Sequence, residues 1–322
     1  TGGAGLIGSN LLKALLNKSN NNIFVVDNLW RGKLENISFL QNDNFNLDEN
    51  FHNLDLKIYK NCLTATKNID HVIHLADVVS GINYVFENEL SLFQSNLRIN
   101  SNVLQACISN NVSNITYVGT ACSYPKEMQS TINEIPFKEE DVYPANPESS
   151  YGWSKLIGEY EIELAGKYDL INTSILRLHN VYGPPSELST ARSQVIPSLC
   201  RKLIMGEEYI VWGSGRQRRS FIYVDDVIDA IMLSLQLENG HEVVQIGTNE
   251  STSIEYIATK YPQVVVGLNT MHGFPTEKKD EAIEHVMLAI ADAERAGVTA
   301  DELYRRTGCF FEDEIREKYQ QK

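Results

Sequence analysis

The chain has 322 residues, with 28 Lys plus Arg against 42 Asp plus Glu, so its formal net charge is −14. A chain this acidic has no general electrostatic attraction for nucleic acid or for an anionic membrane surface. Hydrophobic residues make up 43% of it and charged residues 22%, which is ordinary globular composition, and no apolar run is long enough for a transmembrane helix. Five scattered Cys residues form no C-x-x-C pair, which argues against a metal site or a disulfide framework and predicts a reducing, cytoplasmic location.

Predicted strands and helices alternate along the chain. The helical spacing of apolar residues first appears at 6–17, and a short apolar strand follows at 23–27. Further strands are predicted at 71–75, 115–119, 173–177 and 243–247, and further helices at 88–110, 151–168 and 224–237. This alternation predicts an α/β fold with a doubly wound, Rossmann-like parallel sheet covered by helices on both faces.

A glycine-rich turn opens the chain. Gly2, Gly5 and Gly8 are spaced three residues apart in TGGAGLIGSN, directly before the first predicted helix, and we expect a strand upstream of this turn. The glycines permit a tight turn and a close approach of the backbone to a pyrophosphate, which the N-terminal end of the helix stabilises. Asp27 ends the next predicted strand, where a carboxylate accepts hydrogen bonds from the ribose hydroxyls of NAD and repels a 2′-phosphate. Arg31 lies close by in the sequence, so the sequence alone does not exclude NADP as the cofactor.

A tyrosine and a lysine are spaced as Y-x-x-x-K on the helix predicted at 151–168. Tyr151 and Lys155 therefore face the same way. A tyrosinate can take the proton of a sugar hydroxyl whose carbon is being oxidised, and a nearby ammonium favours that ionised form. The same spacing recurs at Tyr256 and Lys260, but only Tyr151 follows a nucleotide turn, two further strands and a polar strand end.

The polar strand end is the segment GTACSYP. Thr120 is placed to hydrogen-bond a reacting hydroxyl. Cys122 could remove a proton from the carbon beside a new carbonyl group. Taken alone, however, a free cysteine is more often a small buried hydrophobic residue, and that interpretation is favoured for Cys122 by itself.

Together these motifs resemble those of a known family. TGGAGLIGSNL, IDHVIHLAD, GTACSYP, YGWSK, LHNVYGP and RQRRSFIYVDD are similar to motifs of the extended short-chain dehydrogenase/reductases, in their NAD-dependent epimerase/dehydratase family, from residue 1 to about 260. The likeness is strongest to the 3,5-epimerases that act on GDP-mannose. The resemblance implies NAD as cofactor, a nucleotide-sugar substrate, a transient 4-keto intermediate, and a homodimer formed through the helices at 88–110 and 151–168.

The resemblance also implies roles for individual residues. The catalytic set is Thr120, Cys122, Tyr151 and Lys155, with Cys122 as the proton-abstracting residue. The cofactor set is Gly2, Gly5, Leu6, Ile7, Gly8, Asp27, Asn28, Asp55, Leu56, Leu75, Ala76, Tyr151 and Lys155. The substrate set is Gly81, Asn180, Gln194, Lys202 and Arg219. Read alone, Arg219 is equally one of a run of surface arginines.

Three features depart from the family pattern. Gln194 stands where these epimerases carry a lysine or histidine acid, and glutamine does not donate a proton usefully. Asp77 replaces a small residue close to the cofactor. No family pattern is recognised after residue 260, and an Ala- and Glu-rich helical tail is predicted at 262–322, with an apolar stripe ending at Gly297.

These observations predict a domain division and leave alternatives for the function. We expect an NAD-binding domain at 1–170 and a substrate-binding lobe at 171–322, from which residues 221–237 return to the sheet. The alternatives to a 3,5-epimerase are a 4-epimerase of the UDP-glucose type and a non-catalytic NAD-binding protein or inactive fragment.

Overall fold

The computed structural model describes residues 1–18, 21–42, 44–129, 136–186, 193–204, 218–236, 242–254 and 256–257. The chain forms two compact units, the first made of residues 1–181 and 222–249 and the second of 182–221 and 250–322. Lys260 and the tail predicted at 262–322 lie outside the described residues. The division into an NAD-binding and a substrate-binding part stays a prediction.

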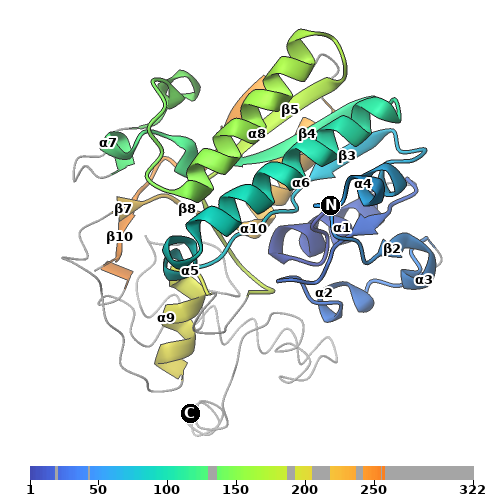
Figure 1. Ribbon diagram of the computed structural model, residues 1–322. Helices are drawn as coiled ribbons and strands as arrows, with labels where there is room; N and C mark the ends of the chain where they lie inside the picture. The colour runs from blue at the N-terminus through green and yellow to red at the C-terminus, as the bar shows by residue number, and fades with distance from the viewer. Residues whose placement is uncertain are drawn as a thin grey trace, which may run out of the picture. The chain divides into compact units, whose positions relative to one another are not determined.

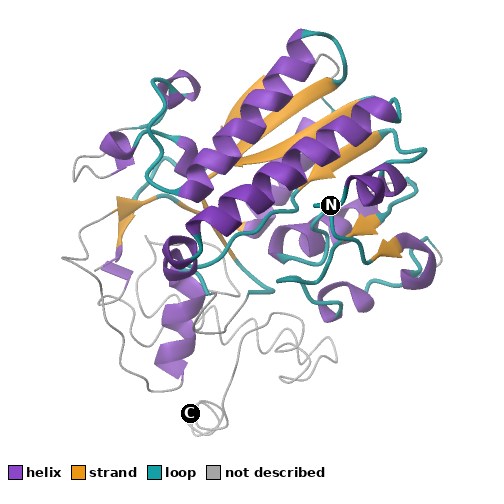
Figure 2. Ribbon diagram, in the orientation of Figure 1, coloured by secondary structure: helices purple, strands orange, loops and turns teal. Residues whose placement is uncertain are grey.

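A four-stranded parallel sheet is the centre of the first unit (Figure 2). Its strands, in spatial order, are β3 (His71–His74), β4 (Asn114–Thr120), β5 (Asn172–Leu178) and β9 (Glu242–Ile246). Each pair is parallel, and the last residue of β4, Thr120, pairs with Leu178. The predicted parallel sheet is therefore confirmed, and its strands end together at the edge where α/β folds bind ligands.

Two shorter strands, which follow the glycine turn and α1 in the chain, form a separate parallel pair. β1 (Val25–Val26) pairs in parallel with β2 (Phe51–His52). β1 is shorter than the strand predicted at 23–27, and Phe24 is 43% exposed. The Gly2 N–H donates to the Val26 carbonyl at 2.7 Å, and the Leu75 N–H donates to the Thr1 carbonyl at 3.3 Å. The start of the chain is thus bonded to the ends of both β1 and β3.

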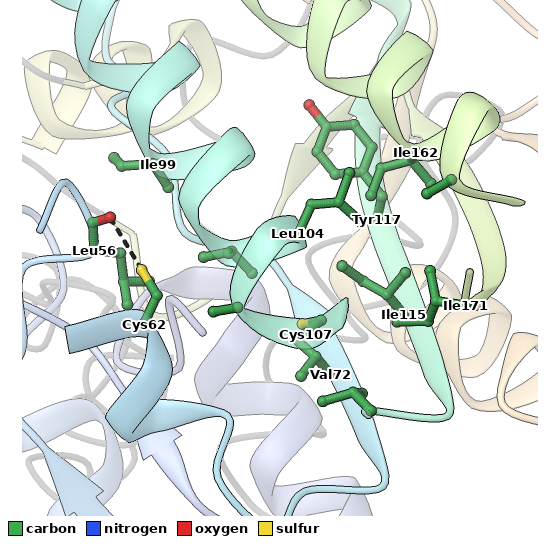
Figure 3. Packing of buried hydrophobic residues seen from close by; sticks show 14 of the residues in the cluster. Leu56, Cys62, Val72, Ile99, Leu104, Cys107, Ile115, Tyr117, Ile162 and Ile171 are labelled. Atoms are coloured by element: carbon green, nitrogen blue, oxygen red, sulfur yellow. Dashed lines mark hydrogen bonds between the residues drawn. The ribbon is translucent and has the colours of Figure 1, made fainter. Parts of the chain in front are cut away.

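Helices cover both faces of the sheet, as predicted. One face carries α4 (Tyr59–Ala65), α6 (Glu89–Ser109) and α8 (Ser150–Lys167), and the other carries α1 (Leu6–Lys18) and α10 (Val224–Ser234). The alternation of side chains along a strand produces the two cores. On β4, Ile115 and Tyr117 pack under α6 and α8 (Figure 3), whereas Val118 packs toward α1 and α10. Figure 1 shows α6 and α8 lying side by side along the sheet.

The remaining elements are short. In the first unit they are α2 (Glu35–Ser38), α3 (Leu47–Asn50), α5 (Ile82–Glu87), η1 (Ala121–Ser123), α7 (Lys126–Gln129) and η2 (Glu139–Val142). The second unit contains α9 (Val195–Ile204) and the antiparallel pair β7 (Arg218–Arg219) and β10 (Thr252–Ser253). β6 (Asn180–Tyr182) and β8 (Phe221–Tyr223) pair where the chain passes from one unit to the other. Among the described residues, no helix combines the length and apolar character that crossing a membrane requires.

Candidate active site

The four predicted catalytic residues come together at the end of β4 and the first turns of α8. Thr120 is the last residue of β4, and its hydroxyl oxygen accepts the Cys122 N–H at 3.2 Å, which caps the short helix η1. Tyr151 and Lys155 lie one turn apart on α8. A Cβ atom on Gly152 would come within 2.2 Å of the Cys122 carbonyl oxygen. The start of α8 can therefore approach Cys122 this closely only because residue 152 has no side chain.

The cysteines of the first unit fall into two kinds. Cys62 and Cys107 are buried in the core, and burial raises the pKa of each thiol to about 12. Cys62 donates its S–H to the Leu56 carbonyl at 3.2 Å (Figure 3). Cys122, by contrast, is exposed. The interpretation of Cys122 as a small buried hydrophobic residue is wrong, because the capped η1 turn holds it at the surface.

Lys155 is buried and forms an ion pair with the Asp77 carboxylate, a contact that the spacing of motifs does not predict. Its side chain is 4% exposed, and its Nζ lies 3.5 Å from Oδ2 of Asp77, whose side chain is 5% exposed. The ammonium also lies 4.4 Å from the centre of the Tyr117 ring. The Tyr117 hydroxyl in turn donates to the Lys155 carbonyl at 3.1 Å. Asp77 stands out in the sequence as an unexpected residue, but its pairing with Lys155 depends on the tertiary structure.

Asn96 on α6 fixes the segment that carries Asp77. Its side-chain Oδ1 accepts the Val78 N–H at 2.8 Å, and its side-chain Nδ2 donates to the Val78 backbone carbonyl at 3.1 Å. The amide also lies 3.3 Å from the Ser154 hydroxyl on α8. Asn96 is fully buried, so these bonds are made away from water, where leaving them unmade is costly. The backbone beside Asp77 therefore has one defined position against α6 and α8.

A second buried polar network supports Lys155 from the sheet. The His74 Nε2 lies 3.1 Å from the side-chain Oδ1 of Asn100, and the Asn100 Nδ2 donates to the Tyr117 hydroxyl at 3.3 Å. Burial, followed by the nearby Lys155 charge, lowers the pKa of His74 to about 3, so the ring is neutral. A Cβ on Gly158 would lie 2.5 Å from the Tyr117 hydroxyl, so the network needs a glycine there.

A buried ion pair holds the loop that follows Cys122. Arg177 on β5 donates through Nε to the two carboxylate oxygens of Glu159 at 2.9 and 3.1 Å, and its Nη2 also contacts this carboxylate. Its Nη1 donates to the Tyr124 hydroxyl at 2.9 Å and to the Glu139 carbonyl at 2.6 Å. The side chains of the pair are 2% and 1% exposed. The sequence predicts a strand through Arg177 but gives no sign of this pair.

The glycine turn has the shape that a dinucleotide pyrophosphate requires. Gly2 has φ +71°, and a Cβ there would meet the Ala76 nitrogen at 2.8 Å. A Cβ on Gly8 would meet the Gly2 carbonyl at 2.3 Å. α1 begins directly after this turn at Leu6 and has no acidic residue in its first turn. The positive end of the helix is thus available to phosphate groups.

Asp27 follows β1 and binds the backbone of the same turn. Its Oδ2 accepts the Ala4 N–H at 3.0 Å, and its Oδ1 accepts the Leu29 N–H at 2.8 Å. Each carboxylate oxygen has a second acceptor position, which leaves capacity for the hydroxyls of a ribose. Arg31 donates from Nη1 to the Val79 carbonyl at 3.0 Å. The residues present fit NAD, because the carboxylate at this position repels a 2′-phosphate.

The other residues of the predicted cofactor set flank this turn or lie on neighbouring loops. Leu75 and Ala76 follow β3, and the Ala76 N–H donates to the Thr1 hydroxyl at 3.2 Å. Asp55 and Leu56 follow β2, where Leu56 is buried and the Asp55 carboxylate lies 3.4 Å from the ammonium of its near neighbour Lys57. The side-chain Oδ1 of Asn28 accepts the Trp30 N–H at 3.0 Å.

The predicted substrate residues are divided between the two units. Gly81 precedes α5 and Asn180 begins β6, both in the first unit. Gln194 precedes α9, where its carbonyl accepts the Ser198 N–H at 2.9 Å, and Arg219 on β7 donates to the Arg218 carbonyl at 2.8 Å. Lys202 lies on α9, but its side chain is outside the described atoms. The predicted catalytic and cofactor residues therefore all lie in the first unit, whereas Gln194, Lys202 and Arg219 belong to the second.

Fold and site define a dinucleotide-binding α/β protein with a half-buried tyrosine and a buried lysine at the carboxyl ends of its strands. The chain belongs to the NAD dependent epimerase/dehydratase family, whose sequence pattern matches residues 1–247. Its cofactor is NAD, as the geometry of the glycine turn and Asp27 also indicates.

Similar proteins act on nucleotide sugars. A GDP-mannose 3,5-epimerase of Arabidopsis thaliana is 30% identical over 80% of this chain and 66% of its own length. A putative UDP-glucose 4-epimerase of Methanocaldococcus jannaschii is 32% identical over 79% of this chain and 77% of its own. Among solved structures, a UDP-glucose 4-epimerase of Thermotoga maritima with UDP-glucose matches with a TM-score of 0.70 at 25% identity, over 86% and 84% of the two chains. A UDP-glucose 4-epimerase of Thermus thermophilus in complex with NAD matches with a TM-score of 0.69 at 25% identity, over 82% of this chain and 81% of its own.

The role of Asp27 leads to a prediction for cofactor binding. Asp27→Asn keeps the shape of the side chain but removes the charge, so we expect the affinity for NAD to fall about 10-fold or more, since hydrogen bonds to a charged group are worth about 1.5–3 kcal/mol. Calorimetric titration of protein stripped of nucleotide measures this. Asp48→Asn, the same change on exposed α3, should bind NAD as the parent does. Equal affinity in both variants would contradict the assignment of Asp27.

Proposed function

We propose that this chain is an NAD-dependent nucleotide-sugar epimerase that works through a transient 4-keto intermediate, with 3,5-epimerisation of GDP-mannose as its particular activity. The observation that carries the proposal is the grouping of Thr120, Cys122, Tyr151 and Lys155 where β4 ends and α8 begins. The likeness to a GDP-mannose 3,5-epimerase supports the particular activity. Since the chain spans only 66% of that relative, its substrate and activity are part of the proposal.

Each catalytic residue has a task in this reaction. NAD, when bound, would supply the acceptor for the hydride that leaves carbon 4 of the sugar and later returns to it. Tyr151 takes the proton of the 4-hydroxyl as this carbon becomes a carbonyl, and gives it back on the return. The Thr120 hydroxyl accepts the Cys122 N–H and keeps its own proton to donate to the reacting oxygen. Lys155, one turn further along α8, supplies a positive charge that favours the ionised tyrosine.

The role of Cys122 separates 3,5-epimerisation from simple 4-epimerisation, which does not need this residue. A 4-keto group acidifies the hydrogens on the neighbouring carbons, so a thiolate can remove one and leave the other face open to reprotonation. Cys122 is exposed beside the start of α8, as this role requires. Ala121 and Cys122 occupy the positions at which the dehydratases of this family, by the sequence resemblance, carry acidic residues. Their absence disfavours dehydration.

Gln194 supports a second candidate function. Its amide cannot act as the acid opposite Cys122, so proton exchange at carbons 3 and 5 would need a donor from elsewhere. Simple 4-epimerisation needs only Thr120, Tyr151 and Lys155. The UDP-glucose 4-epimerases among the relatives and neighbours favour this alternative. A non-catalytic NAD-binding protein is the third outcome that the experiment must separate.

We also propose that the chain acts as a cytoplasmic homodimer formed through α6 and α8. These two helices pack side by side (Figure 1) and carry large apolar side chains that face solvent. Leu90 is 70% exposed, Tyr160 52% and Trp153 37%. Burying such side chains against a second copy would remove apolar surface from water.

Solvent exchange tests the proposed function. The NAD-loaded protein is incubated in heavy water with GDP-mannose and, separately, with UDP-glucose, and the recovered sugar nucleotides are analysed by mass spectrometry. We expect deuterium in the GDP-mannose products and its loss in Cys122→Ala. Cys62→Ala, which removes a buried thiol of the core, is the matched control and should still exchange.

The other outcomes separate the alternatives. A new epimer without deuterium would overturn the role of Cys122 and establish 4-epimerisation. Bound NAD without a new epimer or exchange from either sugar would contradict the proposed activity on these substrates and favour the binding protein.

A further inference from the structure

Asp77 presents a buried carboxylate whose bonds are incomplete. Its side chain is 5% exposed and lies 3.5 Å from the Lys155 ammonium, which is longer than a hydrogen bond. Among the described residues, no hydrogen bond of ordinary geometry reaches either carboxylate oxygen, and the polar groups that interact with it are those of Lys155, Tyr151 and the Val78 backbone. A buried charge in this condition is costly and therefore calls for an explanation.

The position of this carboxylate is fixed from both sides. The Asn96 amide binds both backbone groups of the next residue, Val78, and lies against Ser154 on the helix that carries Lys155. Lys155 is itself held between Asp77 and the Tyr117 ring. Neither Asp77 nor Lys155 can move away from the other without breaking these buried contacts.

Tyr151 lies within the influence of the same pair. Burial raises the pKa of its hydroxyl well above the usual value, and the negative charge of Asp77 adds to this, followed by Cys122 and Tyr117. Burial also raises the pKa of the Asp77 carboxyl, and the Lys155 charge opposes that shift. The negative charge of Asp77 thus offsets the positive charge of the Lys155 ammonium, which would otherwise favour a tyrosinate.

We propose that Asp77 is a positioning residue of this site: its buried carboxylate anchors the Lys155 ammonium and competes with the Tyr151 oxygen for that positive charge. The inference rests on the proposed roles of Tyr151 and Lys155. If this proposal holds, other charges near Asp77 and Lys155 also change how readily Tyr151 ionises. A cationic ring bound there would supply a further positive charge and favour the tyrosinate form.

A spectroscopic titration tests this without any substrate. The near-ultraviolet absorbance of tyrosinate is followed against pH in the full chain, and the curve of the corresponding Tyr151→Phe protein is subtracted, which isolates Tyr151 from the other 14 of the 15 tyrosines. In Asp77→Asn and Asp77→Ala we expect Tyr151 to ionise about one pH unit or more below the parent. The sign follows because removing a negative charge stabilises the phenolate.

Controls keep the test decisive. Asp169→Asn makes the same change at an exposed residue beyond the end of α8, where φ is 53°, which Asn tolerates, and it should leave the curve unchanged. The single Asp77 variants leave the Lys155 ammonium buried without its partner, which could prevent folding. In that case the double variant Asp77→Asn/Lys155→Met, which removes both charges, takes their place. Tyr151 in this double variant should then ionise at lower pH than in Lys155→Met alone.

The results separate this inference from the proposed function. An unchanged or higher ionisation pH in the folded Asp77 variants would overturn the positioning role, whatever the substrate. A downward shift would support it even if the protein failed to epimerise either sugar nucleotide. In an active protein, the acid limb of kcat/KM against pH should move down with the spectroscopic value.

Discussion

Tyr151→Phe is expected to lower kcat for epimerisation by about 10²–10⁴-fold, the usual contribution of a positioned acid–base group. The change keeps the ring that packs at the start of α8 and removes only the hydroxyl. Because the cofactor contacts of the glycine turn and Asp27 remain, NAD binding and stability should stay close to those of the parent. Turnover measured with a saturating nucleotide sugar, together with the NAD content of the same sample, checks both statements.

The second Y-x-x-x-K match in the chain offers the control. Tyr256 lies in the second unit, three residues beyond β10, and Tyr256→Phe makes the same chemical change in a unit that holds none of the predicted catalytic residues. It should leave kcat within a few-fold of the parent. An equal loss in both variants, or a Tyr151→Phe protein of full activity, would show that the tyrosine on α8 is not the acid–base residue.

Arg177→Met is expected to have the largest effect on stability. It leaves the Glu159 carboxylate buried without its partner, and breaking a buried pair from one side costs about 3–5 kcal/mol. The Tyr124 hydroxyl and the Glu139 carbonyl lose a donor at the same time. Urea unfolding followed by circular dichroism measures the free energy of unfolding and shows whether the transition stays cooperative.

Two further variants isolate the cause. Arg177→Met/Glu159→Leu removes both charges and should recover a large part of the loss, since an apolar pair replaces an ionic one at little cost. Lys57→Met breaks the exposed pair with Asp55, whose side chains are 39% and 36% exposed, and should cost no more than about 1 kcal/mol. An Arg177→Met protein as stable as Lys57→Met would contradict the structural importance of the buried pair.

Local patterns in the sequence predict the frame of the site well. The strands through residues 115–119 and 173–177 and the helix at 151–168 follow from apolar periodicity, which the buried faces of β4, β5 and α8 explain. The four-residue spacing of Tyr151 and Lys155 is enough to place both on one side of α8. The glycine turn is also predictable, because the space at Gly2 and Gly8 excludes any side chain.

Contacts between distant segments could not be predicted from these patterns. Asp77 and Lys155 meet only because β3 lies beside β4 under α8, and Arg177 reaches Glu159 and residue 139 only in the folded chain. Gly152 and Gly158 belong to no glycine motif, yet each allows a close approach of backbone or hydroxyl. Such residues are selected by tertiary packing, which a single sequence does not display.

Transfer of the hydrogen on carbon 4 tests the central claim most directly. The NAD-loaded protein is incubated with GDP-mannose or UDP-glucose that carries deuterium on carbon 4, and the products are analysed by mass spectrometry and nuclear magnetic resonance. The account predicts an epimer that keeps its deuterium on carbon 4, because the label leaves that carbon and returns to it without meeting solvent. An epimer that has exchanged this label for solvent hydrogen, or no epimer from either sugar, would contradict oxidation and re-reduction at carbon 4.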